Sequence, residues 1–196
     1  MSNITVHQRP GVYSSYDASS VVSGSGTGKL VGLVAVNTKA TPGVAQTITS
    51  YDRAVSAFGD GEAEGMAELI RLALRNGASG VVAVPVADAQ GYEDAFAQLA
   101  AVEEIAVALC DSTDEEVQQA LRDSVEEAAQ ARRERLAVVA GEADETVSEL
   151  IDRAKALKDE RVVLVAPGGV DGEGEPLSGL PLAAAVAGTI AGERDP

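Results

Sequence analysis

Residues 72–86 join an amphipathic run to a short apolar run through an Asn-Gly pair, and this stretch constrains the fold most strongly. Leading into it, apolar residues recur at helical spacing: Met66, Leu69, Ile70, Ala73 and Leu74. Asn76-Gly77 supplies a residue that can turn left-handed and end a helix. Residues 81–84 are Val-Val-Ala-Val without polar alternation, which predicts a strand covered on both faces.

The same alternation of strand and helix continues to the end of the chain. Strands are predicted to begin at residues 30, 81, 105, 136 and 161, with a short edge strand at 46–49. Besides the helix that Asn76-Gly77 closes, helices are predicted at 50–59, 92–101, 112–133, 144–157 and 180–191. This order predicts an α/β fold, with a mostly parallel sheet of about five strands between two helix layers.

Two of these helices carry detailed predictions. Ser112 and Glu115 are spaced as a capping box for the helix at 112–133, and basic residues near its end suit the helix dipole: Arg132, Arg133 and Arg135. The helix at 144–157 is predicted to turn one apolar stripe inward: Val147, Leu150, Ile151, Ala154 and Leu157.

Charge and composition exclude several classes of function. The net charge of −16 argues against nucleic acid or an anionic membrane surface as a partner. No apolar run is long enough to span a bilayer, which favours a soluble cytoplasmic protein. The single cysteine, Cys110, ends an apolar run and is expected to be buried, and the single histidine, His7, lies near a terminus. Neither supports a metal site or a nucleophile.

The first 22 residues differ from the rest and are predicted to form an extended arm, leaving residues 23–196 as the α/β domain. A strand-like patch from Val12 to Tyr16 is interrupted by serines. Residues 23–30 superficially resemble a phosphate-binding loop. However, Ser23 replaces the first glycine, Leu30 replaces the magnesium-binding hydroxyl, and a strand follows where the motif requires a helix. The glycines are better explained as a hinge: Gly24, Gly26 and Gly28.

Ligands of parallel sheets bind beyond the carboxyl ends of the strands. The residues expected there are Asp88, Asp111, Ser112, Glu142 and the Pro-Gly-Gly run at 167–169. Asp111 and Glu142 could act as an acid–base pair or bind a hard cation. Capping of helix N-termini explains acidic residues at such positions better. The sequence thus predicts no catalytic residue, no cofactor and no metal.

Several motifs, in their order along the chain, resemble the N-terminal half of a contractile tail sheath protein from a bacteriophage or a phage-derived injection system. The motifs are Arg9-Pro10-Gly11-Val12-Tyr13, the strand at 31–36, Thr49-Ser50-Tyr51 with Phe58-Gly59, the stretch at 72–86, Ala166-Pro167-Gly168 and the alanine-rich run at 183–188. Each motif is weak alone, and together they cover nearly the whole chain.

The resemblance implies a structural protein with no enzymatic activity. Such subunits form helical rings around a tail tube protein, contact baseplate and tail terminator proteins, and contract to drive the tube through a cell envelope. They assemble in the bacterial host cytoplasm and reside in the virion tail. The arm, with Pro10, Gly11, Val12, Tyr13 and Tyr16, would add a strand to a neighbouring subunit.

One departure from the family pattern concerns the region after the alanine-rich helix. In the family a further domain follows that helix, contacts the tube and receives the arms of neighbours, whereas this sequence stops at Asp195-Pro196. The chain by itself is therefore expected to lack the acceptor for its own arm. Two other functions stay open: a small-molecule or nucleotide-binding module of flavodoxin-like type, and an acidic adaptor that binds another protein.

Overall fold

The computed structural model describes residues 29–60 and 63–193. The predicted arm and the hinge glycines Gly24, Gly26 and Gly28 lie outside the described residues, and so does His7. The arm residues Pro10, Gly11, Val12, Tyr13 and Tyr16, and the division at residue 22, therefore stay predictions.

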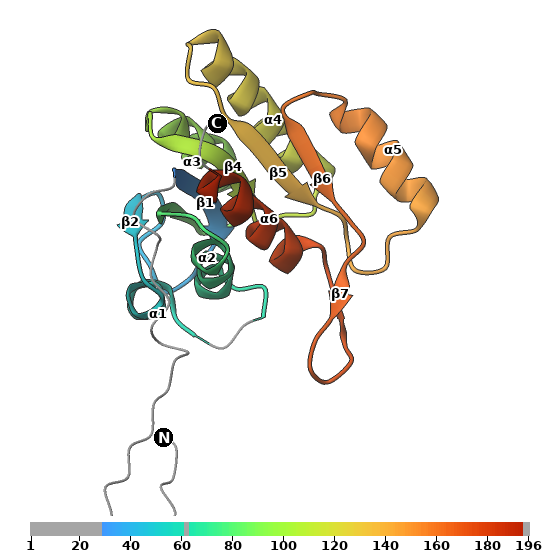
Figure 1. Cartoon of the computed structure of the whole chain (residues 1–196), viewed down its shortest axis with the longest axis horizontal. Coiled ribbons are helices and arrows are strands. Elements are labelled where there is room, and N and C mark those ends of the chain that lie inside the picture. Colours follow the sequence, from blue (N-terminus) through green and yellow to red (C-terminus); the bar gives the residue numbers. More distant parts are fainter. Residues whose placement is uncertain (1–28, 61–62, 194–196) are drawn as a thin grey trace, which may run out of the picture.

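A six-stranded sheet forms the centre of the fold, in the order β2-β3-β1-β4-β5-β6 (Figure 1). Its strands are β1 (Leu30–Val36), β2 (Gln46–Ile48), β3 (Gly80–Val86), β4 (Ile105–Cys110), β5 (Leu136–Ala140) and β6 (Val162–Val165). β2 pairs antiparallel with β3, and the other four pairings are parallel. The five predicted parallel strands are confirmed, and the short edge strand joins them as a sixth.

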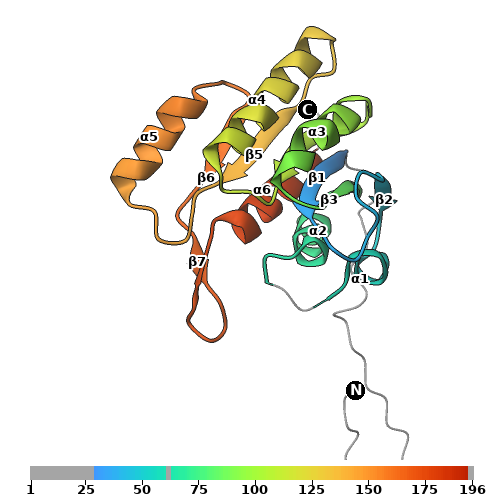
Figure 2. The same cartoon turned by 180° about the vertical axis from the view of Figure 1, so that it is seen from behind.

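Helices cover both faces of the sheet, as Figures 1 and 2 show from opposite sides. One face carries α1 (Tyr51–Phe58), α2 (Met66–Arg75) and α6 (Leu180–Gly192); the other carries α3 (Tyr92–Ala100), α4 (Glu115–Gln130) and α5 (Val147–Leu157). A 3-10 turn, η1 (Ala89–Gly91), precedes α3. A hairpin of β7 (Gly169–Val170) and β8 (Pro176–Leu177) projects from the sheet (Figure 1). The predicted α/β class is confirmed.

The core is built mostly from small and branched residues, because the chain contains no Trp, two Phe and four Tyr. All seven residues of β3 are buried, which confirms a strand covered on both faces. Helix α2 ends beside Gly77, whose φ of 120° provides the left-handed turn expected of the Asn-Gly pair. Helices α2 and α6 cross closely where Gly188 meets Ala73: a Cβ on Gly188 would lie 2.2 Å from the Ala73 carbonyl oxygen.

The predicted capping box at Ser112 and Glu115 is wrong. Helix α4 begins at Glu115, and its N-cap is Asp114, whose carboxylate accepts a 2.8 Å hydrogen bond from the Glu116 amide. Ser112 instead stabilises the turn before the helix, where its hydroxyl accepts from the Asp114 amide. The fold does contain a capping box, at Thr146 and Glu149 of α5. Spacing alone did not select between neighbouring cap residues.

The arginines after α4 stabilise a different helix from the one predicted. The guanidinium of Arg133 donates to the Ala100 carbonyl at 2.8 Å, and that of Arg135 donates to the carbonyls of Leu99 and Val102 at 2.9 and 3.0 Å. These carbonyls belong to the C-terminal end of α3, which has no basic residue in its last turn. Charge–dipole stabilisation therefore acts between neighbouring helices.

Helix α5 does not bury its whole apolar stripe. Leu157 is buried and Leu150 is half-buried, but the side chains of Val147 and Ile151 are 74% and 49% exposed. The buried face instead contains Arg153. The prediction that five apolar residues of this helix face inward is therefore wrong for three of them: Val147, Ile151 and Ala154.

Candidate functional site

Asp111, at the carboxyl end of β4, holds two neighbouring elements together. Its carboxylate accepts a 2.8 Å hydrogen bond from the Val36 amide, at the end of β1, and a 2.5 Å hydrogen bond from the Tyr92 hydroxyl, at the start of α3. Burial raises the pKa of Asp111, and the two donors partly oppose that rise. Burial, with the Asp111 charge, also raises the pKa of Tyr92. The carboxylate thus has protein partners on both oxygens.

Arg153 is the centre of a buried polar network at the carboxyl end of β5. Its Nε lies 2.8 Å from Glu145, and its Nη1 donates to the Thr113 carbonyl at 2.6 Å and to the Gln118 side chain at 3.1 Å. Gln118 in turn donates to the Ala140 carbonyl at 2.8 Å. Arg153 and Gln118 are 4% and 0% exposed. The network joins α4 and α5 to the sheet, because each side chain has its partners within the protein.

The other residues expected at the strand ends stabilise turns. Asp88 accepts from the Gln90 amide at 3.0 Å and caps η1. Glu142 is exposed and lies 3.8 Å from Arg153, whereas Asp111 bonds to Val36 and Tyr92. The carboxylates of Asp111 and Glu142 share no hydrogen-bond or ion-pair partner among the described residues. They do not form an acid–base pair there.

Two further residues near the strand ends are packed into the fold. A Cβ on Gly168, in the run at 167–169, would lie 2.0 Å from the Leu177 carbonyl oxygen, so this glycine allows the hairpin to fold back. Cys110 is fully buried, as predicted, and burial raises the pKa of its thiol to about 12. Such a thiol is a poor nucleophile, because the reactive species is the thiolate.

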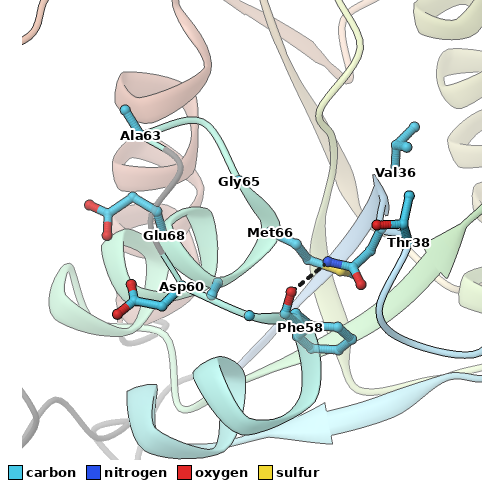
Figure 3. A pocket seen from close by; sticks show the side chains of 11 residues that line it. Val36, Thr38, Phe58, Asp60, Ala63, Gly65, Met66 and Glu68 are labelled. Atoms are coloured by element: carbon cyan, nitrogen blue, oxygen red, sulfur yellow. Dashed lines mark hydrogen bonds between the residues drawn. The ribbon is translucent and has the colours of Figure 1, made fainter.

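A hollow of about 580 Å³ lies between the end of β1 and the start of α2 (Figure 3). Asn37 lines one wall of the hollow, and its side-chain amide donates to the Phe58 carbonyl at 2.8 Å. Asp60 and Glu68 give the rim a negative charge, and Glu68 is already paired with Arg71. A phosphate or carboxylate would be repelled here in spite of the helix N-terminus at Gly65.

The described residues contain neither a candidate metal cluster nor a candidate membrane span. Across residues 29–60 and 63–193, no three His, Cys, Asp or Glu side chains cluster as metal ligands would. None of the helices in the described part of the chain combines the length and the apolar character that a membrane span requires. The sequence did not indicate the Arg153 network; its only signal was an arginine placed between Leu150 and Leu157 on an inward-facing stripe.

No protein-family model matches the chain, and no curated protein matches it significantly in sequence. Several solved structures do resemble the chain in fold. A sheath tail protein from Desulfitobacterium hafniense superposes with a TM-score of 0.65 at 14% identity, covering 94% of this chain and 63% of that one. A sheath tail protein from Listeria innocua gives a TM-score of 0.61 at 11% identity, covering 90% and 59%.

The helical sheath of the anti-feeding prophage, in its contracted state, gives a TM-score of 0.60 at 23% identity and covers 93% of this chain and 52% of that one. This is the sheath-protein fold. The family resemblance read from the sequence motifs is thereby confirmed at the level of the fold. The chain spans between about half and two thirds of the length of these sheath structures.

Proposed function

We propose that the chain is a structural subunit of a contractile tail sheath. The observation that carries this proposal is the fold similarity to sheath proteins, which extends over nine tenths or more of the chain. The strand ends agree with a structural role, because the polar side chains there bond to one another and to the backbone. The small-molecule alternative has weaker support, since the hollow in Figure 3 has an acidic rim and no built anion site.

In this role the subunit would polymerise in helical rings around a tail tube protein. Residues 1–22 would act as the arm, and Gly24, Gly26 and Gly28 would let the arm keep its attachment while subunits rotate. Contacts with the tube, baseplate and terminator proteins belong to the same proposal, as does a location in the particle tail after assembly in the host cytoplasm. The subunit would do mechanical work and would not catalyse a reaction.

Negative-stain electron microscopy tests the proposal. The purified protein is imaged over a range of concentrations, alone and together with the tube protein of the same particle and a sheath protein that carries the further domain. Rings or hollow cylinders are expected from the mixture, and dispersed subunits from this chain alone, because it is expected to lack the acceptor for its own arm. Dispersed single subunits under every condition, together with saturable binding of a small molecule, would contradict the sheath role.

A deletion tests the arm. A variant lacking residues 1–16 is expected to keep the circular dichroism and thermal transition of the intact chain, because the described domain begins at residue 29. The same variant is expected to form no rings or cylinders. Unimpaired assembly would rule out the arm as the link between subunits.

A further inference from the structure

The net charge of this chain exceeds what solubility alone explains. A charge of about 2–8 in magnitude keeps a small domain soluble, whereas this chain has 31 acidic and 15 basic residues and a net charge of −16. Residues 1–28 contain one arginine and one aspartate, so the whole excess belongs to residues 29–196. At least 16 carboxylates therefore have no basic side chain of their own.

Several basic side chains are also committed to the interior of the fold. Arg133 and Arg135 donate to backbone carbonyls at the C-terminal end of α3. Arg153 is buried beside Glu145. The chain contains four lysines in all, so it has few long, flexible cations for its surface. The carboxylates at the surface are therefore poorly neutralised by the protein itself.

The excess of carboxylates is concentrated on one helix layer (Figure 2). Helices α3 and α4 pack against each other, and together they contain one basic residue, Arg122. On the other face of the sheet, α1 and α2 contain three basic and two acidic residues, and α6 contains no charged residue. The exposed acidic residues of α3 and α4 are Glu93, Asp94, Glu115, Glu116, Asp123, Glu126 and Glu127.

A second group of carboxylates surrounds a hollow at the amino ends of β1 and β4. The hollow has a volume of about 540 Å³, and its lining includes Glu103, Glu104 and Glu134 together with Lys29. Three carboxylates beside one ammonium group leave this end of the sheet negative as well. Like charges are thus close together at two separate places on the domain.

The salt concentration determines how strongly these groups repel one another. On α4, Asp123 precedes Glu126 and Glu127 by three and four residues, which places their Cβ atoms about 5–6 Å apart. Charge–charge interactions in solution extend over about 10 Å at 0.1 M salt and about 3 Å at 1 M. Repulsion therefore acts along α4 at ordinary ionic strength and is screened at molar salt. The last turn of α4 contains no basic residue, so the helix dipole adds to the repulsion of Glu127.

The apolar core that opposes this repulsion is made largely of small side chains. The buried residues of α6 are Leu180, Ala183, Ala184, Ala187, Gly188 and Ala191. Apolar stabilisation is proportional to the area removed from water, so alanine and glycine contribute less than leucine. Folding free energies are small differences between large opposing terms, and repulsion among many like charges shifts that difference.

We propose that the domain is built for a solvent of molar salt, in which screening of its own carboxylates is required for a stable fold. The screening ions form a diffuse layer of monovalent cations over the acidic surface, without a separate binding site for each ion. At ordinary ionic strength the unscreened repulsion destabilises the compact state. The inference goes beyond the proposed sheath role and does not depend on it, because it concerns the ionic conditions in which the protein works.

Thermal unfolding followed by circular dichroism tests this proposal. The intact chain is heated in KCl from about 0.1 M to about 3 M, and its Tm is expected to rise by about 10 °C or more and then to level off. NaCl should act like KCl at equal concentration, because screening depends on ionic charge alone. A Tm that stays level or falls with salt would overturn the proposal. A rise with only one of the two salts would indicate a bound ion and would also overturn it.

Four isosteric substitutions separate screening from a general effect of salt on the apolar core. They are made together at exposed positions and remove four of the 16 excess negative charges: Glu103→Gln, Glu104→Gln, Glu126→Gln and Glu127→Gln. Repulsion scales with the square of the net charge, so the rise in Tm with salt should fall by about two fifths. The matched control changes the same four residues to aspartate, which keeps the net charge and should keep the full rise.

The two variants give distinct outcomes. An undiminished rise in the glutamine variant would show that salt acts by exclusion from the protein surface, and this would overturn the proposal. An equal loss of the rise in both variants would overturn it too, because side-chain shape and not charge would then be responsible. These measurements involve no assembly, so the sheath role is tested separately by electron microscopy.

Discussion

Replacing Gly188 with alanine is expected to force α2 and α6 apart. The added Cβ would lie 2.2 Å from the carbonyl oxygen of Ala73 and 2.8 Å from its Cα, whereas ordinary van der Waals contact begins at 3.4 Å. The obstacle is backbone on a neighbouring helix, which cannot rotate away as a side chain can. Relief of the clash requires the two helices to separate by about 1 Å or more over a buried interface.

The expected cost follows from two opposing effects. Overpacking of a core typically costs about 1–3 kcal/mol, and a backbone clash belongs at the upper end of that range. Alanine regains about 1 kcal/mol over glycine in helix propensity. The net loss of stability is therefore about 2 kcal/mol, which corresponds to a fall in Tm of about 4–8 °C for a chain of this length.

Thermal and urea unfolding measure this effect, and two controls isolate its cause. Gly172→Ala, where nothing lies within 4 Å, is expected to change stability by less than about 0.5 kcal/mol. Thr189→Ala alters an exposed position of the same helix and should not destabilise. Adding Ala73→Gly to Gly188→Ala should not rescue stability, because the clash is with the backbone. An unchanged Tm for Gly188→Ala, or a rescue by Ala73→Gly, would refute the reasoning.

Three further substitutions test the polar interactions. Thr146→Ala removes the capping box of α5 and is expected to cost about 1 kcal/mol in urea unfolding, while Ser148→Ala on the same helix should cost little. Arg153→Met leaves Glu145 buried without its partner and is expected to cost about 3–5 kcal/mol, and a double variant with Glu145→Leu should recover part of that loss. Asp111→Asn tests the pH dependence of stability. Burial raises the pKa of Asp111 in the folded chain, so its titration adds to the free energy of unfolding at low pH, and this addition is lost as pH rises through that pKa. The stability of the native chain relative to the variant should increase as pH is lowered from 7 toward 4, and a decrease would contradict the assignment.

The sequence predicted the parts of the fold that follow from local patterns. Short branched runs such as residues 81–84 gave the strands, and Asn76-Gly77 gave the end of α2, because periodicity and turn chemistry act within a few residues. The inward face of α5 could not be predicted in this way. Its apolar stripe is continuous in sequence, and which half is buried depends on where the sheet ends, which is set by β6.

The candidate site was less predictable than the fold. Capping by Asp88 agreed with the expectation for acidic residues at strand ends. By contrast, Asp111 joins β1 to α3, and Arg153 of α5 bonds to the carbonyl of Thr113, which lies 40 residues earlier in the chain. Such pairings depend on three-dimensional proximity and leave no spacing pattern in the chain. For the same reason, Arg133 and Arg135 were assigned to the dipole of the wrong helix.

The first and last parts of the described domain meet at one point. The Lys29 amide, where the chain enters β1, donates to the Ala191 carbonyl near the end of α6 at 2.8 Å. Tension applied between the N-terminal segment and the end of α6 would therefore load this one hydrogen bond first and β1 next, because the covalent path between the two points runs through the sheet.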